Sequence, residues 1–146
     1  MKILAICLSY YEHNEVEKLL FWISDGDVRK TRGVDVSSLN IKDGNFHNLV
    51  VVVSHDLSVS FYVDGVLIAV RPMTDTLNVD ALQNSQSDLQ IGAWGSNSNY
   101  RLNGQIDDLK IYKAALDVSQ ISASCDSKGD FFLIPTANGK NSIIHL

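Results

Sequence analysis

The sequence has little of what catalytic and metal sites are usually built from. Its three glutamates all lie within residues 12–17, and its two cysteines, at positions 7 and 125, belong to no paired motif. The four histidines, at positions 13, 47, 55 and 145, show no spacing typical of zinc ligands. There is also no phosphate-binding glycine loop and no G-x-S-x-G string. These absences argue against metal-cluster, nucleotide-dependent and serine-hydrolase chemistry.

Positive charge is scarce as well. Twelve Lys and Arg residues stand against seventeen Asp and Glu residues, which gives a net charge of −5. The one basic cluster, at residues 29–32, directly follows Asp25 and Asp27. Because an acidic surface repels phosphate backbones, we expect no nucleic-acid partner. No apolar run is long enough for a membrane span, and 45% hydrophobic with 20% charged residues is the composition of an ordinary folded domain.

The N-terminal segment, MKILAICLSYYEHNE, superficially resembles a secretory leader. Its apolar stretch ends in two tyrosines rather than small residues, and Ile6 rather than a small residue precedes Cys7. We therefore interpret it as a strand. The sequence leaves two alternatives open for Cys7 and Cys125, a disulfide or two free and buried thiols.

What the chain does contain is strand periodicity. Residues 57–63 alternate apolar and polar side chains, whereas residues 49–53 are apolar throughout, which predicts a central strand covered on both faces. Five of nine glycines follow Asp or Asn, as is typical of tight hairpins. A short helix is predicted at 117–123, with Asp117 and Gln120 as a capping box. The expected strands are 2–10, 18–24, 33–40, 47–54, 57–64, 66–72, 88–94 and 105–113. This pattern over 146 residues predicts one all-β antiparallel sandwich domain.

Several strings, in this order, resemble the laminin G-like domains of the concanavalin A-like lectin/glucanase superfamily. They are Phe46-His47-Asn48 before the valines, Tyr62-Val63-Asp64-Gly65-Val66-Leu67, Leu89-Gln90-Ile91-Gly92, and Gly104 to Tyr112 followed by Ala114-Ala115-Leu116. The resemblance implies a jelly-roll fold, a glycan or protein ligand, and an extracellular or cell-surface location. Phe46 stands where the family usually has Trp, and we expect Phe46 to serve as the aromatic plug in its place. We interpret His47 as a hydrogen-bonded structural residue rather than a general base.

The family domain usually ends near residue 123, but this chain continues. Residues 126–146 are expected to form a strand, an Asn-Gly turn and a second strand, and residues 129–135 resemble the first strand of such a domain. This terminal hairpin would either replace the missing N-terminal strands, as in a circular permutation, or supply them to another copy in a homo-oligomer. A truncated tandem array is the other interpretation.

The superfamily includes glucanases that carry Glu-x-Asp-x-Glu on one strand, and this chain lacks that string. Among its glutamates, the spacing places Glu15 and Glu17 on a common face with no aspartate between them, and we interpret EHNEVE as a solvated loop. We therefore expect a non-catalytic protein, with a glycoside hydrolase as the less favoured alternative.

Ligand binding is expected in the loop after Ile91. Aromatic rings cover the apolar faces of sugars, while amides and a guanidinium bind hydroxyl groups. The candidate contacts are Trp94, Asn97, Asn99, Tyr100 and Arg101. Alternatively, Trp94 covers the sheet or a neighbouring subunit.

Asp107 is the candidate metal ligand. No cofactor follows from the residues alone, but related laminin G-like domains often carry a rim calcium ion, and Asp107 is expected on the same strand face as Leu109 and Ile111. A carboxylate at the end of a sheet needs partners, either a metal ion or backbone amides.

Overall fold

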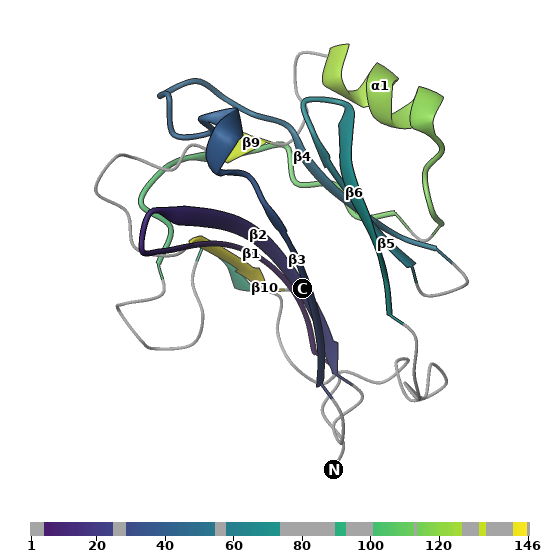
Figure 1. Cartoon of the computed structure of the whole chain (residues 1–146). Helices are drawn as coiled ribbons and strands as arrows, with labels where there is room; N and C mark the ends of the chain where they lie inside the picture. The colour runs from purple at the N-terminus through teal and green to yellow at the C-terminus, as the bar shows by residue number, and fades with distance from the viewer. Residues whose placement is uncertain are drawn as a thin grey trace.

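The computed structural model describes residues 5–24, 29–54, 58–73, 90–92, 101–112, 114–126, 132–133 and 142–145. Within these residues the chain forms antiparallel sheets with a single α-helix, so the predicted all-β sandwich is confirmed. The two larger sheets face each other (Figure 1). No helix among the described residues has the length and apolar character needed to span a membrane.

The first sheet has five strands in the order β3-β2-β1-β10-β7. They are β1 (Ala5–His13), β2 (Val16–Ser24), β3 (Arg29–Asp35), β7 (Gln90–Ile91) and β10 (Ser142–His145). β3 ends earlier than expected, because the Asp35 carboxylate accepts a 2.9 Å bond from the Ser37 amide and turns the chain into the 3-10 helix η1 (Ser37–Leu39).

The segment EHNEVE is not the solvated loop that the sequence suggests. It is the tip of the β1–β2 hairpin, with Asn14 and Glu15 at φ angles of 50° and 65°. Both central residues of a type I′ turn need positive φ, and a glutamate there gives no sequence signal. Glu12 and Glu17 are therefore strand residues that lie directly opposite each other.

The second sheet contains β4 (Leu49–Val53), β5 (Ser58–Val63) and β6 (Val66–Pro72) in that order. The predicted Asp64-Gly65 reversal joins β5 to β6, with φ angles of 50° and 77°. β4 is the end strand of this sheet within the described residues, not the central strand that its valines suggested.

The core lies between the two sheets. Alternate side chains of β1 and β2, including Tyr10, Leu19 and Phe21, pack with Val59 and Phe61 of β5, and all five are at least 96% buried. Burial of this kind is the main favourable contribution to folding. Phe46, by contrast, is 42% exposed, so it is not the expected aromatic plug.

Helix α1 (Val118–Asp126) begins one residue after its predicted start at 117 and ends three residues after its predicted end at 123. Its capping box is confirmed, since the Gln120 amide donates to the Asp117 carboxylate at 2.8 Å and the Asp117 amide donates to Gln120 Oε1 at 2.9 Å. The helix lies against the β5–β6 turn (Figure 1), where Cys125 Sγ would stand 3.2 Å from a Cβ placed on Gly65.

Both cysteines are free thiols, so the disulfide alternative is not realised. Cys7 lies on β1 and is fully buried, whereas Cys125 on α1 is half-buried. Burial raises the pKa of Cys7 to about 12.

The C-terminal strands do not pair with each other. β9 (Phe132–Leu133) pairs with β8 (Ile106–Asp107), whereas β10 lies between β1 and β7. The expected terminal hairpin is therefore divided between two sheets. The expected strand at 105–113 is reduced to β8, because Asp108 adopts a φ of 52° that breaks the extended backbone. Of the expected strand at 88–94, the described part is β7 and a bend at Gly92.

Candidate functional site

The base of the candidate ligand loop is closed by a backbone hydrogen bond. The Leu102 amide donates to the Gly92 carbonyl at 2.7 Å, and Gly92 has a φ of +75° that favours glycine. Leu102 also packs against the core. Gly92 and Leu102, which flank residues 93–101 in the sequence, are therefore held together.

Of the predicted ligand contacts, the structure describes one. Arg101 is exposed at the base of this loop. Trp94, Asn97, Asn99 and Tyr100 lie outside the described residues.

Asp107 is exposed on β8, opposite Phe132. The expected face shared with Leu109 and Ile111 is not formed, because the strand ends at Asp107. Calcium takes six to eight oxygen ligands, and no group of three acidic, His or Cys side chains suited to a metal occurs in the described part of the chain. Calcium binding at Asp107 therefore stays a prediction.

The connecting loop, residues 40–48, carries two charged clusters that the sequence analysis missed. In the Lys42 cluster, Lys42 Nζ lies 2.8 Å from both a Glu12 and a Glu17 carboxylate oxygen. The hydrogen bonds that Lys42 donates, first to Glu12 and then to Glu17, raise the pKa of Lys42 well above its usual range. The sequence signal that could have revealed this cluster is the position of Glu12 and Glu17, each two residues from the Asn14-Glu15 turn, which makes them cross-strand partners.

The Lys42 cluster also includes a buried phenol. Tyr10 is 1% exposed, and burial followed by the adjacent Glu17 carboxylate raises its pKa far above its usual range. Neither the Tyr10 hydroxyl nor Glu17 Oε2 has a well-directed hydrogen bond within the described residues. Lys42 occupies the space between the two carboxylates, where a retaining hydrolase would hold the glycosidic oxygen. Lys42 therefore joins the connecting loop to β1 and β2 of the first sheet.

In the His47 cluster, one imidazole lies between two carboxylates. His47 Nδ1 is 2.8 Å from Asp64 Oδ2, and His47 Nε2 is 3.0 Å from Asp43 Oδ1. Burial by itself lowers the pKa of His47, but the hydrogen bonds to Asp64 and Asp43 outweigh it, so the pKa is raised. These bonds confirm that His47 is a hydrogen-bonded residue of the fold.

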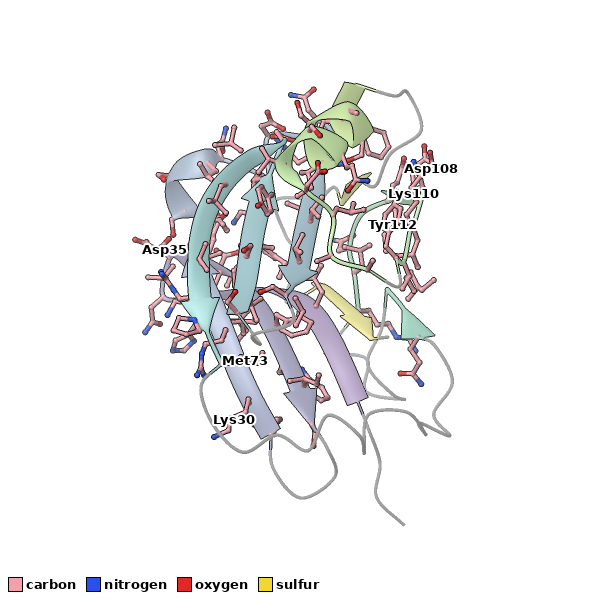
Figure 2. The ribbon with its side chains drawn as sticks, turned by 90° about the vertical axis from the view of Figure 1, so that its right-hand side faces the viewer. Lys30, Asp35, Met73, Asp108, Lys110 and Tyr112 are labelled. Carbon is pink, nitrogen blue, oxygen red and sulfur yellow. The ribbon has the colours of Figure 1, made fainter. Side chains whose placement is uncertain are left out.

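The basic residues of β3 lie at a different margin of the sandwich. Arg32 Nε donates to the Pro72 carbonyl of β6 at 2.6 Å, and the Arg29 guanidinium lies 5.9 Å from the centre of the Trp22 ring. Figure 2 shows Lys30 and Met73 on this margin, and Asp108, Lys110 and Tyr112 on the opposite side of the view. Arg32 thus links the two sheets.

A comparison with protein families agrees with this architecture. A laminin G family model, described as the concanavalin A-like lectin/glucanases superfamily, matches residues 7–122. Among solved structures, the crystal structure of an S-layer domain-containing protein from Clostridium thermocellum is 16% identical, with a TM-score of 0.46. That match covers 86% of this chain and 64% of the other, so this chain spans less than two thirds of it. No curated protein matches.

Proposed function

This chain belongs to the concanavalin A-like lectin/glucanases superfamily, and we propose that it is a non-catalytic binding module that recognises a glycan or a protein surface through a loop at the rim of its sandwich. Laminin G-like domains are generally non-catalytic. An extracellular or cell-surface location is part of this proposal, as is usual for the family.

The observation that carries the proposal is the closed base of residues 93–101. Because the Leu102–Gly92 hydrogen bond fixes both ends of the loop, its aromatic, amide and guanidinium groups can be presented with less loss of conformational entropy on binding. Arg101 is exposed at this base and has five N–H donors for hydroxyl, carboxylate or amide oxygens. A shallow site of this kind should bind weakly, in a range of about 1 µM to 1 mM, so repetition would be needed for strong attachment.

A glycan array followed by calorimetric titration of the hits tests this proposal. We expect Trp94→Ala and Arg101→Ala each to weaken binding by about tenfold or more, equivalent to about 1.4 kcal/mol. Tyr112→Ala and Arg71→Ala remove an exposed aromatic ring and an exposed guanidinium outside the loop, so they are matched controls. Equal weakening by the control variants, or no binding to any glycan or protein probe, would contradict the proposal.

Assembly through the C-terminal segment is the second proposal. β10 contributes a strand between β1 and β7, and a terminal strand in such a position can be exchanged with another copy. Light scattering after size-exclusion chromatography should then detect a dimer, and deletion of residues 126–146 should abolish it. A full-length chain that stays monomeric at high concentration would exclude assembly by exchange.

Hydrolysis is the least favoured function. It would be supported by β-glucan turnover that is lost in Glu12→Gln or Glu17→Gln, since these carboxylates, unlike Glu15, face each other.

A further inference from the structure

His47 joins two turns that are distant in the sequence. Its ring nitrogens face Asp43, in the turn at residues 43–45, and Asp64, at the tip of the β5–β6 hairpin. A neutral imidazole has one N–H group, whereas an imidazolium ion has two. Because both nitrogens face carboxylate oxygens at hydrogen-bond distance, only the protonated ring can donate to both.

We propose that His47 is a pH-sensitive clamp that holds the turn at residues 43–45 against the β5–β6 hairpin while its imidazole is doubly protonated. Loss of one proton places a nitrogen lone pair against a carboxylate oxygen. One of the two contacts is then repulsive, and the link between the turns opens.

The other hydrogen bonds of Asp43 and Asp64 remain after the link opens. The Asp43 carboxylate also accepts bonds from the Asn45 amide at 2.7 Å and from Asn45 Nδ2 at 2.8 Å. The Asp64 carboxylate also accepts from the Asn48 amide at 2.8 Å, and the Asp64 amide donates to the Asn48 carbonyl. Deprotonation therefore frees the turn at residues 43–45 from Asp64, while Asn48 stays bonded to the hairpin and neither turn has to unfold.

The charges around the ring favour the protonated state. Asp43 from the turn and Asp64 from the hairpin are the charged groups that face the imidazole in the described structure. The nearest cation in the sequence, Lys42, is held by Glu12 and Glu17 on the other side of the loop. The His47 side chain is 13% exposed, so water screens these interactions incompletely.

The direction of the pH effect follows from the raised pKa of His47. Below the ordinary histidine pKa of about 6.5, the ring is charged in both the folded and unfolded chain, and the clamp contributes its full stabilisation. That contribution is lost as the pH rises through the higher pKa of the folded protein. The clamp is thus closed below the pKa of His47 in the folded chain and open above it.

The part of the chain that opening would release is short. Ile41 and Leu49 are buried in the core on either side of it. Lys42 stays held by Glu12 and Glu17, and Asn48 stays bonded to Asp64. Movement is therefore confined to residues 43–47, including the half-exposed Phe46 ring, at one end of the sandwich. This gives the domain a rim segment whose position responds to pH.

Ring resonances of the unmodified full-length protein test the clamp directly by NMR. We expect the pKa of His47 in the folded chain to lie above the ordinary histidine pKa of about 6.5, with both N–H protons present at pH 6. A His47 that titrates at or below about 6.5, or that carries a single N–H proton at pH 6, would overturn the proposal.

Thermal melting of variants gives an independent test. Between pH 6 and pH 9 the melting temperature of the native chain should fall by about 2–4 °C more than that of His47→Gln or Asp43→Asn. Asn at position 43 keeps an oxygen for the Asn45 amide and removes the charge. His13→Gln, the matched control, should retain the native pH dependence. Parallel profiles for the native chain, His47→Gln and Asp43→Asn would show that no clamp operates.

Discussion

The connecting loop is attached to the two sheets by the same device, one cation between two carboxylates, but the two cations differ. On the side of the first sheet the cation is the Lys42 ammonium, between Glu12 and Glu17. On the side of the second sheet it is the His47 imidazole. The pKa of Lys42 is raised from a value that is already far above neutrality, whereas the pKa of His47 is raised from about 6.5.

The carboxylates also differ in what holds them. Glu12 and Glu17 are cross-strand partners in a regular ladder. Asp43 and Asp64 lie in turns, and Asp64 adopts a φ of 50°. A permanent cation held by carboxylates on strands gives a fixed attachment, and a titratable cation held by carboxylates in turns gives an adjustable one.

The largest effect should come from breaking the fixed attachment. Lys42→Met leaves two facing carboxylates without their cation, and we expect a loss of about 2 kcal/mol in the free energy of unfolding at pH 7, between the values for exposed and fully buried pairs. The side chains of Lys42, Glu12 and Glu17 are 19%, 34% and 13% exposed, which supports this intermediate value. Urea denaturation measures it.

Lys18→Met, on an exposed strand position, is the matched control and should cost less than about 0.5 kcal/mol. If Lys42→Met unfolds at the same urea concentration as Lys18→Met, the ammonium contributes no attachment.

A smaller effect should come from the hairpin that carries Asp64. Gly65 has a φ of +77°, and a Cβ there would stand 3.2 Å from Cys125 Sγ of helix α1. We expect Gly65→Ala to lower the free energy of unfolding by about 1.5 kcal/mol, from left-handed strain and displacement of the helix. Thermal and urea unfolding would measure the loss.

Gly44→Ala separates these two causes. Gly44 has a φ of +88°, but a Cβ added there would meet no atom within 4 Å, so this variant reports strain alone. If Gly65→Ala lowers the free energy of unfolding more than Gly44→Ala does, the contact with helix α1 stabilises the β5–β6 hairpin that carries Asp64. Equal losses of unfolding free energy in the two variants would mean that helix α1 does not stabilise this hairpin.

Local sequence signals account for much of the fold and for part of these attachments. Asp64-Gly65 and the Asp117/Gln120 capping box were predicted because each depends on residues only a few positions apart. The hydrogen-bonded role of His47 was also predicted, although its two carboxylate partners were not.

The parts that were missed depend on backbone angles and distant pairing. Glu15 adopts positive φ in the β1–β2 turn without any sequence signal, and this hid the pairing of Glu12 with Glu17. Asp108 ends β8 in the same way. The position of β10 between β1 and β7 joins segments far apart in the chain, which no short pattern encodes.

The smallest effect is expected at Asp107, a carboxylate that belongs to neither the Lys42 cluster nor the His47 cluster. Asp107 is exposed, so Asp107→Asn should change the free energy of unfolding by less than about 0.5 kcal/mol in calcium-free buffer. If calcium binds there, as the family resemblance suggests, adding it at one hundred times its dissociation constant should stabilise the native chain by about 2.7 kcal/mol. Asp107→Asn should lose that gain, and Asp108→Asn shows whether the neighbouring carboxylate shares the ion. A melting temperature that calcium does not change would exclude the metal, and Asp107 would then differ from Asp43 and Asp64 in needing only water as its partner.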